Sequence, residues 1–330
     1  MRKIKLRKEF RITMIQDIYP HKLNNQYKTN AKATLDSIIL YFTKDGLLHQ
    51  LLSHDDMRQI GKEDLFSLDE MVHTGDGKNL ARPYHLNEEP LFLSFPRLSD
   101  FSEDHSVTEE SLTYLFSIDK ENYFLLNKQP EELPEGYAFQ SVRELRKMEI
   151  GPKHRIFAAI TGLQLYNWYR NNRFCGRCGH STVLSSTERA LKCPFCGHIL
   201  YPRIVPAVIV GVRNGDKILV TKYKTGFSHY ALVAGFTEIG ETLEETVERE
   251  VMEETGLRVK NICYYKSQPW GIVDDLLAGF YCDVDGNTDI HMDQSELKLA
   301  EWKTRDEIVL QPDDFSLTNE MMQVFKNGRD

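Results

Sequence analysis

Short apolar segments separated by polar residues dominate the first 150 residues of the chain. Runs rich in β-branched and aromatic residues at 36–42, 90–95 and 122–127 predict strands. Residues 141–148 have the spacing of a short helix. These segments together predict a mixed α+β domain over residues 1–150, whose role the pattern does not reveal.

A longer helical pattern follows at residues 154–172. Ile156, Ile160 and Leu163 recur at helical spacing, and further apolar residues widen the same surface. Such a surface is typical of a helix in a core or at an interface. We therefore interpret residues 151–172 as a linker helix.

Strand-like runs return in residues 204–330, which we expect to form a further domain. The runs at 205–212 and 217–223 flank an Asn-Gly pair, which is typical of a β-hairpin between two apolar runs. Three further strands and a closing helix are predicted at 258–267, 276–284, 299–303 and roughly 316–327.

Composition narrows the class of protein. Of the 330 residues, 41% are hydrophobic and 27% are charged, which suits a packed soluble protein. No apolar run reaches the roughly 18 residues of a membrane span, and no apolar stretch follows the basic first 13 residues. We therefore expect neither a membrane partner nor a signal peptide. The net charge of −8 disfavours sequence-specific nucleic-acid binding but leaves nucleotides as ligands, because a metal can bridge carboxylates to phosphates.

Four of the six cysteines form two Cys-x₂-Cys knuckles within residues 173–203. This spacing predicts a zinc ribbon in a reducing cytoplasm, and its duplication argues against the alternative of a redox dithiol. Four thiolates leave the zinc no open position, so it would stabilise structure and do no chemistry. Cys263 and Cys282 are expected to be small core residues. The predicted zinc ligands are Cys175, Cys178, Cys193 and Cys196.

An acidic helix is predicted to begin after a glycine-containing loop. Thr242 and Glu245 have the spacing of a capping box, and Gly256 is a plausible stop. Apolar residues recur every four positions and form the expected buried stripe, namely Leu243, Val247 and Val251.

Three glutamates of this helix, Glu250, Glu253 and Glu254, share one face. Their carboxylates repel one another, so a cation is expected among them. The alternative is a solvated acidic face, but the preceding loop and the adjacent Arg249 argue against it. Mg²⁺ and Mn²⁺ take oxygen ligands, bridge to phosphates and can activate a water for attack on phosphorus.

The segment from 235 to 257 resembles the Nudix box at every fixed position. The resemblance implies an α/β/α sandwich with a mixed sheet, and hydrolysis of a nucleoside diphosphate linked to another group. The matching pattern is Gly235-x₅-Glu241-x₇-Arg249-Glu250-Val251-x-Glu253-Glu254-x-Gly256-Leu257.

By this resemblance, Glu250, Glu253 and Glu254 would hold the catalytic Mg²⁺ or Mn²⁺. One of them, or a carboxylate outside the box, would orient or deprotonate the attacking water. Arg249 and Glu241 would brace the loop and the helix by a salt bridge.

A zinc ribbon directly before such a domain is similar to the NADH pyrophosphatase, or NAD(+) diphosphatase, subgroup. Ser267-Gln-Pro-Trp270 matches the beginning of that subgroup's own sequence motif. The resemblance implies cleavage of NAD(H) to nicotinamide mononucleotide and AMP, removal of NAD caps from RNA in some members, and a homodimer.

The same resemblance implies further site residues. Phe236 would stack on a base, Tyr201 and Ile209 would line its pocket, and Glu296 would be an additional metal ligand. Gln268 and Trp270 belong to the expected substrate loop. Ordinary roles remain open as alternatives: core packing for Phe236 and Ile209, solvation for Glu296, and shaping of a turn for Tyr201.

The chain departs from the subgroup after Trp270. Its motif is usually Ser-Gln-Pro-Trp-Pro-Phe-Pro-x-Ser, whereas Gly271-Ile-Val-Asp274-Asp275 follows here. Loss of the prolines predicts a less rigid loop, and its two carboxylates would repel phosphate but accept hydrogen bonds from ribose hydroxyls. Alternatives to NAD(H) are ADP-ribose, a dinucleoside polyphosphate or NAD-capped RNA. A nucleotide sensor or regulator is the alternative of another class.

Overall fold

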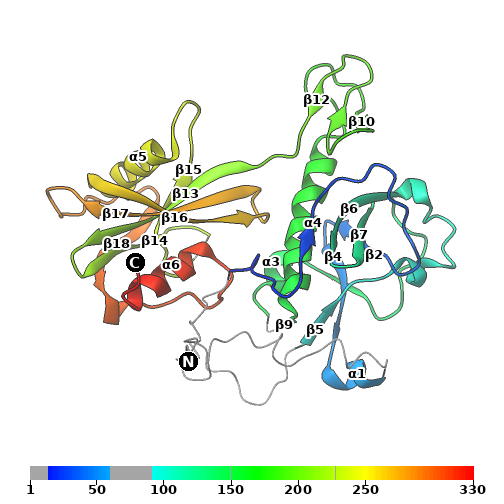
Figure 1. Ribbon diagram of the computed structural model, residues 1–330, viewed down its shortest axis with the longest axis horizontal. Coiled ribbons are helices and arrows are strands. Elements are labelled where there is room, and N and C mark those ends of the chain that lie inside the picture. The colour runs from blue at the N-terminus through cyan, green and yellow to red at the C-terminus, as the bar shows by residue number, and fades with distance from the viewer. Residues whose placement is uncertain (1–13, 60–90, 149, 227) are drawn as a thin grey trace, which may run out of the picture.

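The computed structural model describes residues 14–59, 91–148, 150–226 and 228–330. The basic first 13 residues lie outside this range. Figure 1 shows an N-terminal region on one side and a C-terminal sheet on the other, with a small ribbon projecting beyond the end of α4 (Lys153–Asn171). No helix in the described part of the chain is long and apolar enough to cross a membrane.

The N-terminal region consists of two small sheets packed beside α4. Their strand orders are β1-β6-β7-β2 and β3-β4-β5-β9, with β8 paired to β4. Leu40, Phe116 and Ile156 belong to one core that joins these sheets to α4. The elements are β1 Leu23–Asn24, β2 Ile38–Leu40, β3 Phe42–Thr43, β4 Gly46–Leu52, α1 His54–Gln59, β5 Leu91–Ser94, β6 Leu112–Ile118, β7 Glu121–Leu126, β8 Ala138–Gln140, α3 Val142–Leu145 and β9 Ile150–Gly151.

The predicted α+β character of this region is confirmed, but its strands were only partly predicted. The run at 36–42 forms two short strands instead of one, because the chain passes from one sheet to the other near Tyr41. The pattern did not predict β6, which is buried along almost its whole length and so lacks the polar–apolar alternation of a half-exposed strand.

The ribbon follows α4 and contains three short antiparallel strands. Val183 pairs with Lys192, and Lys192 pairs with Ile199, so one row of side chains crosses the whole sheet. The strands are β10 Val183–Leu184, β11 Leu191–Lys192 and β12 Ile199–Leu200.

The C-terminal region is a mixed sheet covered by a helix on each face. Its order is β16-β17-β13-β14-β18, with β15 also paired to β13, and the β13–β17 pair is parallel. Val208 and Val251 share the core under α5, whereas Ile209 and Met321 share the core under α6. The predicted α/β/α sandwich is confirmed. Its elements are β13 Val205–Asn214, β14 Lys217–Tyr223, β15 Val233–Phe236, α5 Leu243–Thr255, β16 Val259–Trp270, β17 Asp275–Val284, β18 Leu297–Thr304 and α6 Leu317–Lys326.

Local signals placed most of these C-terminal elements correctly. The Asn214-Gly215 pair turns β13 into β14, and Gly215 adopts a positive φ of 62° that suits glycine. Cys282 is buried as expected. The same expectation is wrong for Cys263, which is exposed because it lies on β16, an edge strand of the sheet.

The segment from Ser267 to Asp275 lies where the N-terminal and C-terminal regions meet. Ser267–Trp270 complete β16, and Trp270 pairs with Asp275 at the start of β17. The connecting turn is packed, because a Cβ at Gly271 would lie 2.8 Å from the carbonyl oxygen of Ile160 in α4. Glycine permits this close packing, and the lower rigidity expected of the loop stays a prediction.

Hydrogen bonds and an ion pair hold the residues of this junction in place. Arg146 donates to both carboxylate oxygens of Asp313 at 2.8 and 3.1 Å, and its guanidinium carbon lies 4.5 Å from the centre of the Trp270 ring. Gln268 is fully buried, donates to the Phe315 carbonyl at 2.7 Å and accepts from the Leu317 amide at 2.7 Å. The Arg146–Asp313 pair thus attaches the N-terminal region to the C-terminal region.

Removing the positive charge at this junction should destabilise the fold. Arg146→Met would leave Asp313, whose side chain is mostly buried, without its partner, and we expect a loss of about 3 kcal/mol in unfolding free energy. Arg143→Met in the adjacent α3 is the control, because Arg143 makes only a 3.5 Å contact to the Ile272 carbonyl. Urea denaturation measures both. Equal losses in the two variants would contradict the importance of the Arg146–Asp313 pair.

Candidate functional site

The acidic helix α5 begins and ends where its sequence predicts. The Thr242 hydroxyl accepts from the Glu245 amide at 3.2 Å, and the Glu245 carboxylate accepts from the Thr242 amide at 2.8 Å. Gly256 ends the helix with a positive φ of 71°. This capped helix holds its glutamates in a fixed relation to the end of β15.

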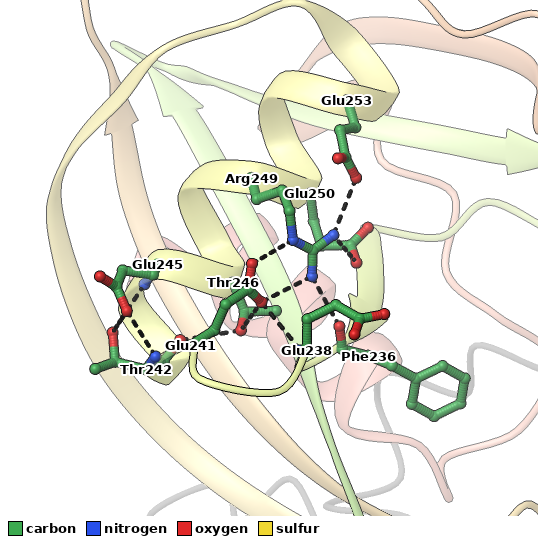
Figure 2. Close-up of polar contacts among 9 residues, drawn as sticks. All are labelled: Phe236, Glu238, Glu241, Thr242, Glu245, Thr246, Arg249, Glu250 and Glu253. Atoms are coloured by element: carbon green, nitrogen blue, oxygen red, sulfur yellow. Dashed lines mark hydrogen bonds and ion pairs between the residues drawn. The ribbon is translucent and has the colours of Figure 1, made fainter.

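Arg249 ties the loop before α5 to the helix itself, as Figure 2 shows. Its Nε donates to Glu241 Oε1 at 2.5 Å, and its Nη2 donates to Glu241 Oε2 and to the Phe236 carbonyl, both at 2.9 Å. Its Nη1 donates to Glu250 at 2.8 Å and to Glu253 at 3.0 Å. The expected Arg249–Glu241 salt bridge is therefore present. The Arg249 guanidinium is the main reason that the pKa of Glu241 falls to about 2.

Glu254 is the most deeply buried carboxylate of the site, with only 3% of its surface exposed. Its Oε1 accepts from the Tyr223 hydroxyl at 3.1 Å, whereas its Oε2 is buried without a hydrogen-bond partner among the described residues. Burial, together with the negative charges of Glu250 and Glu296, raises the pKa of Glu254 to about 8 in spite of the opposing hydrogen bond from Tyr223. The pKa of Glu250 is also raised, mainly by burial.

The end of β15 is shaped around the Glu250 carboxylate. A Cβ at Gly235 would lie 1.9 Å from the carboxyl carbon of Glu250, so only glycine leaves room for it. This contact explains the glycine of the motif through close approach, since Gly235 is not among the glycines with positive φ.

In the part of the chain that the structure describes, no three ligand atoms of the α5 glutamates and Glu296 lie within 4.8 Å of one another, although their oxygens are the donors that a hard divalent cation takes. Such an ion would provide a partner for Glu254 Oε2 and offset the repulsion that raises the pKa values of Glu250 and Glu254. Glu253 is exposed and its carboxylate contacts Arg249, so it lies at the outer side of this group.

The four predicted zinc ligands converge in the ribbon. Among the described residues, they form the only group of three or more His, Cys, Asp or Glu ligand atoms within 4.8 Å of one another. Cys178 Sγ lies 3.5 Å from Cys193 Sγ and 3.4 Å from Cys196 Sγ. Thiolates about 2.3 Å from a tetrahedral zinc are separated by about 3.8 Å, so the group fits a structural Zn²⁺ after a small adjustment.

The two knuckles have the same backbone geometry. Cys175 donates its amide to the His180 carbonyl at 2.8 Å, and Cys193 donates to the His198 carbonyl at 2.8 Å. Gly179 has a positive φ of 75°, which the turn requires. The zinc ribbon is therefore preorganised by its own backbone hydrogen bonds.

The structure does not gather all predicted substrate residues into one place. The Phe236 ring is 52% exposed at the end of β15, and Tyr201 is exposed and donates to Glu188 at 3.2 Å. Ile209 is only 5% exposed and packs in the core under α6. Within this chain, Ile209 therefore contacts core side chains instead of an open pocket.

Gln268 and Trp270 lie three strands away from the strand that carries Phe236. Gln268 pairs with Leu277, Leu277 with Ala207, and Ala207 with Phe236. Three inter-strand steps of about 4.8 Å separate the Cα atoms of Gln268 and Phe236 by about 14 Å. The amide group of Gln268 is engaged in hydrogen bonds at the junction between the regions. A substrate role stays a prediction for both residues, and these hydrogen bonds disfavour it for Gln268.

Sequence reasoning missed one contact of the site and did not indicate the burial of one loop carboxylate. Tyr223, at the end of β14, supplies the hydroxyl next to Glu254, and nothing in the spacing of its strand marks it. Asp275 is buried, and its pKa rises to about 7 because of burial and then the nearby Asp274 charge. Of the two carboxylates expected to accept hydrogen bonds from ribose hydroxyls, Asp275 is therefore buried within the chain.

Comparison with known proteins agrees with this geometry. A family model described as NUDIX domain matches residues 202–324, and one described as NADH pyrophosphatase zinc ribbon domain matches residues 170–201. The sandwich and its acidic helix thus define a Nudix domain. The chain belongs to the NADH pyrophosphatase family of Nudix hydrolases.

Three relatives, each named NAD-capped RNA hydrolase NudC, illustrate this membership. The protein of Shigella dysenteriae is 41% identical over 52% of this chain and 66% of its own length. Those of Enterobacter sp. and Actinobacillus succinogenes are 39% and 34% identical, over 54% and 66% of this chain and over 72% and 83% of their own lengths. The alignment to the Shigella protein thus spans slightly less than two thirds of that relative.

Displacing the Glu250 carboxylate should weaken cation binding. Gly235→Ala would push this carboxylate aside, and we expect the affinity for Mn²⁺ to fall at least about tenfold, measured by electron paramagnetic resonance titration. In a Glu250→Ala background the same substitution meets no carboxylate and should have no further effect. An equal loss of affinity in both backgrounds would contradict the proposed contact.

Proposed function

We propose that this protein hydrolyses the central pyrophosphate of NAD(H), giving nicotinamide mononucleotide and AMP, with Mg²⁺ or Mn²⁺. The observation that carries this proposal is the buried Glu254, whose Oε2 lacks a partner while Glu250 and Glu296 add negative charge around it. Such an arrangement suits cation-assisted attack on a phosphate. The zinc-ribbon description and the names of the relatives support a dinucleotide substrate.

The residues of the site have distinct roles in this proposal. Glu250, Glu254 and Glu296 would hold the cation, which supplies charge neutralisation at the pyrophosphate and lowers the pKa of a bound water. Arg249 positions Glu250 and Glu253 by donating to both carboxylates. One of the glutamates accepts the proton of the attacking water. Phe236 offers an exposed ring on which a base can stack.

NAD-capped RNA is the second candidate substrate. The relatives are named as NAD-capped RNA hydrolases, which favours this substrate, and the same bond would be cleaved in the cap. ADP-ribose and dinucleoside polyphosphates require the same chemistry, but no feature of the site favours them. A purely sensory role would not require the complete set of carboxylates that α5 carries.

We also propose that the protein acts as a homodimer in the cytoplasm. Large apolar side chains are exposed together where the ribbon leads into β13, at Ile204, Val273 and Leu276. They are neighbours because the Val205 amide donates to the Asp274 carbonyl at 2.8 Å. An exposed apolar group of this kind is typical of a subunit interface, and the four ribbon thiols suit a reducing compartment.

The proposed substrate can be tested by product analysis. Incubation with NADH and Mg²⁺ should release AMP and reduced nicotinamide mononucleotide in equal amounts, as measured by chromatography. ADP-ribose is the comparison substrate, because it carries the same pyrophosphate without nicotinamide. A far faster cleavage of ADP-ribose than of NADH would overturn the assignment.

Replacing Glu254 should separate catalysis from folding. We expect Glu254→Gln to lower kcat at least about a hundredfold, because a neutral amide oxygen holds the cation more weakly than a carboxylate and cannot accept a proton. Thermal stability should be unchanged or higher, since burial no longer opposes a charge. Glu248→Gln, an exposed position on the same helix, is the control and should retain full activity. A Glu254→Gln variant with nearly normal turnover would refute this role.

A further inference from the structure

The zinc ribbon is basic in an otherwise acidic protein. Residues 170–204 contain six Lys or Arg residues and a single acidic residue, Glu188, whereas the whole chain has 41 basic and 49 acidic residues. Zinc bound by four thiolates carries a formal charge of −2, which reduces the positive charge of the ribbon but does not cancel it. The ribbon is therefore a positive projection on a negative molecule.

Several of these cations are available to a partner. Arg173, Arg177 and Lys192 are exposed, and they form no ion pair within the part of the chain that the structure describes. Arg189 differs, because it donates to the Asn25 carbonyl at 3.1 Å and attaches the ribbon to the N-terminal region. The cations at the outer part of the ribbon are thus not needed to attach it.

The ribbon also carries an aromatic pair, close in sequence to two of these cations. His180 and Phe195 stack with their ring centres 4.0 Å apart and their planes only 9° from parallel. Phe195 is 70% exposed, so the pair is not part of a core. Arg177 belongs to the same knuckle as His180, and Lys192 directly precedes the knuckle that contains Phe195.

The ribbon sheet continues the same mixture of apolar and basic groups. Val183, Lys192 and Ile199 form one cross-strand row, and all three are exposed. Exposed aromatic rings among unpaired cations are the features with which proteins bind single-stranded nucleic acid: bases stack on the rings and phosphates contact the cations.

We propose that the ribbon binds the single-stranded RNA that follows an NAD cap, with bases stacked on the His180–Phe195 pair and phosphates held by Arg177 and Lys192. Because this proposal concerns the substrate, it rests on the proposed function. A second copy of the chain is the less suitable occupant, because two ribbons in a symmetric contact would bring like charges together.

The ribbon is connected closely enough to the site to serve one substrate. β12 ends at Leu200, and Ala207, seven residues later, pairs directly with Phe236. Seven residues span at most roughly 25 Å, which a few nucleotides of extended RNA can cover. A cap near Phe236 and RNA on the ribbon are therefore compatible.

RNA binding can be measured without any hydrolysis. The probe is an uncapped, fluorescein-labelled single-stranded RNA of about 12 nucleotides, titrated with the zinc-loaded full-length protein and followed by anisotropy. Phe195→Ala should raise Kd at least about fivefold through lost stacking. Arg177→Ala with Lys192→Ala should reduce the slope of log K against log salt by about 1.4, for two lost phosphate contacts.

Lys120→Ala, in the turn between β6 and β7, is the control for loss of one exposed positive charge outside the ribbon and should leave Kd unchanged. Zinc content is measured in each variant to show that the ribbon remains intact. Unchanged RNA affinity in both ribbon variants would overturn the proposal. If, in addition, light scattering shows that the ribbon variants dissociate from a dimer to monomers, the ribbon would be a contact between copies.

Hydrolysis separates this proposal from the proposed function. The ribbon variants should raise KM for NAD-capped RNA at least about fivefold while leaving the kinetics of free NAD unchanged. Equal losses on both substrates would contradict an RNA-specific role. A protein that binds the RNA probe through the ribbon but cleaves neither substrate would refute the proposed function and leave the ribbon proposal standing.

Discussion

Five hydrogen bonds from one guanidinium determine how the acidic site is arranged. Arg249 contacts Glu241, the Phe236 carbonyl, Glu250 and Glu253, and so uses every N–H that an arginine side chain has. These contacts hold the loop against the helix and offset part of the repulsion among the carboxylates. Glu254 receives none of them. Its buried Oε2 therefore remains without a hydrogen-bond partner among the described residues.

Residues of the sheet also determine how the carboxylates are placed. Gly235 leaves room for the Glu250 carboxylate, and Tyr223 on the neighbouring β14 donates to Glu254. The positions of these two residues are fixed by strand pairing, whereas those of the glutamates are fixed by the turn of α5. The site thus depends on the exact placement of a capped helix against the end of a strand, and this requires the packed core of the sandwich.

The sequence was most informative about structural features formed by residues that lie close together in the chain. The cap at Thr242, the turn at Gly215 and the cysteine knuckles are local, and each formed as expected. Contacts between distant segments were not predictable, because no spacing records them. Gln268 illustrates this: its motif suggested a substrate loop, yet its amide joins Gln16 and the Phe315 carbonyl at a junction between regions. Tyr223 was missed for the same reason.

Anomalous diffraction from crystals grown with Mn²⁺ would test the central claim most directly. The account predicts a manganese peak coordinated by carboxylate oxygens of Glu250 and Glu254, with Glu254 Oε2 among the ligands, and Arg249 still bound to Glu241. A peak elsewhere, or a well-occupied Mn²⁺ that leaves Glu254 Oε2 without contact, would contradict the assignment of this carboxylate group as the catalytic metal site.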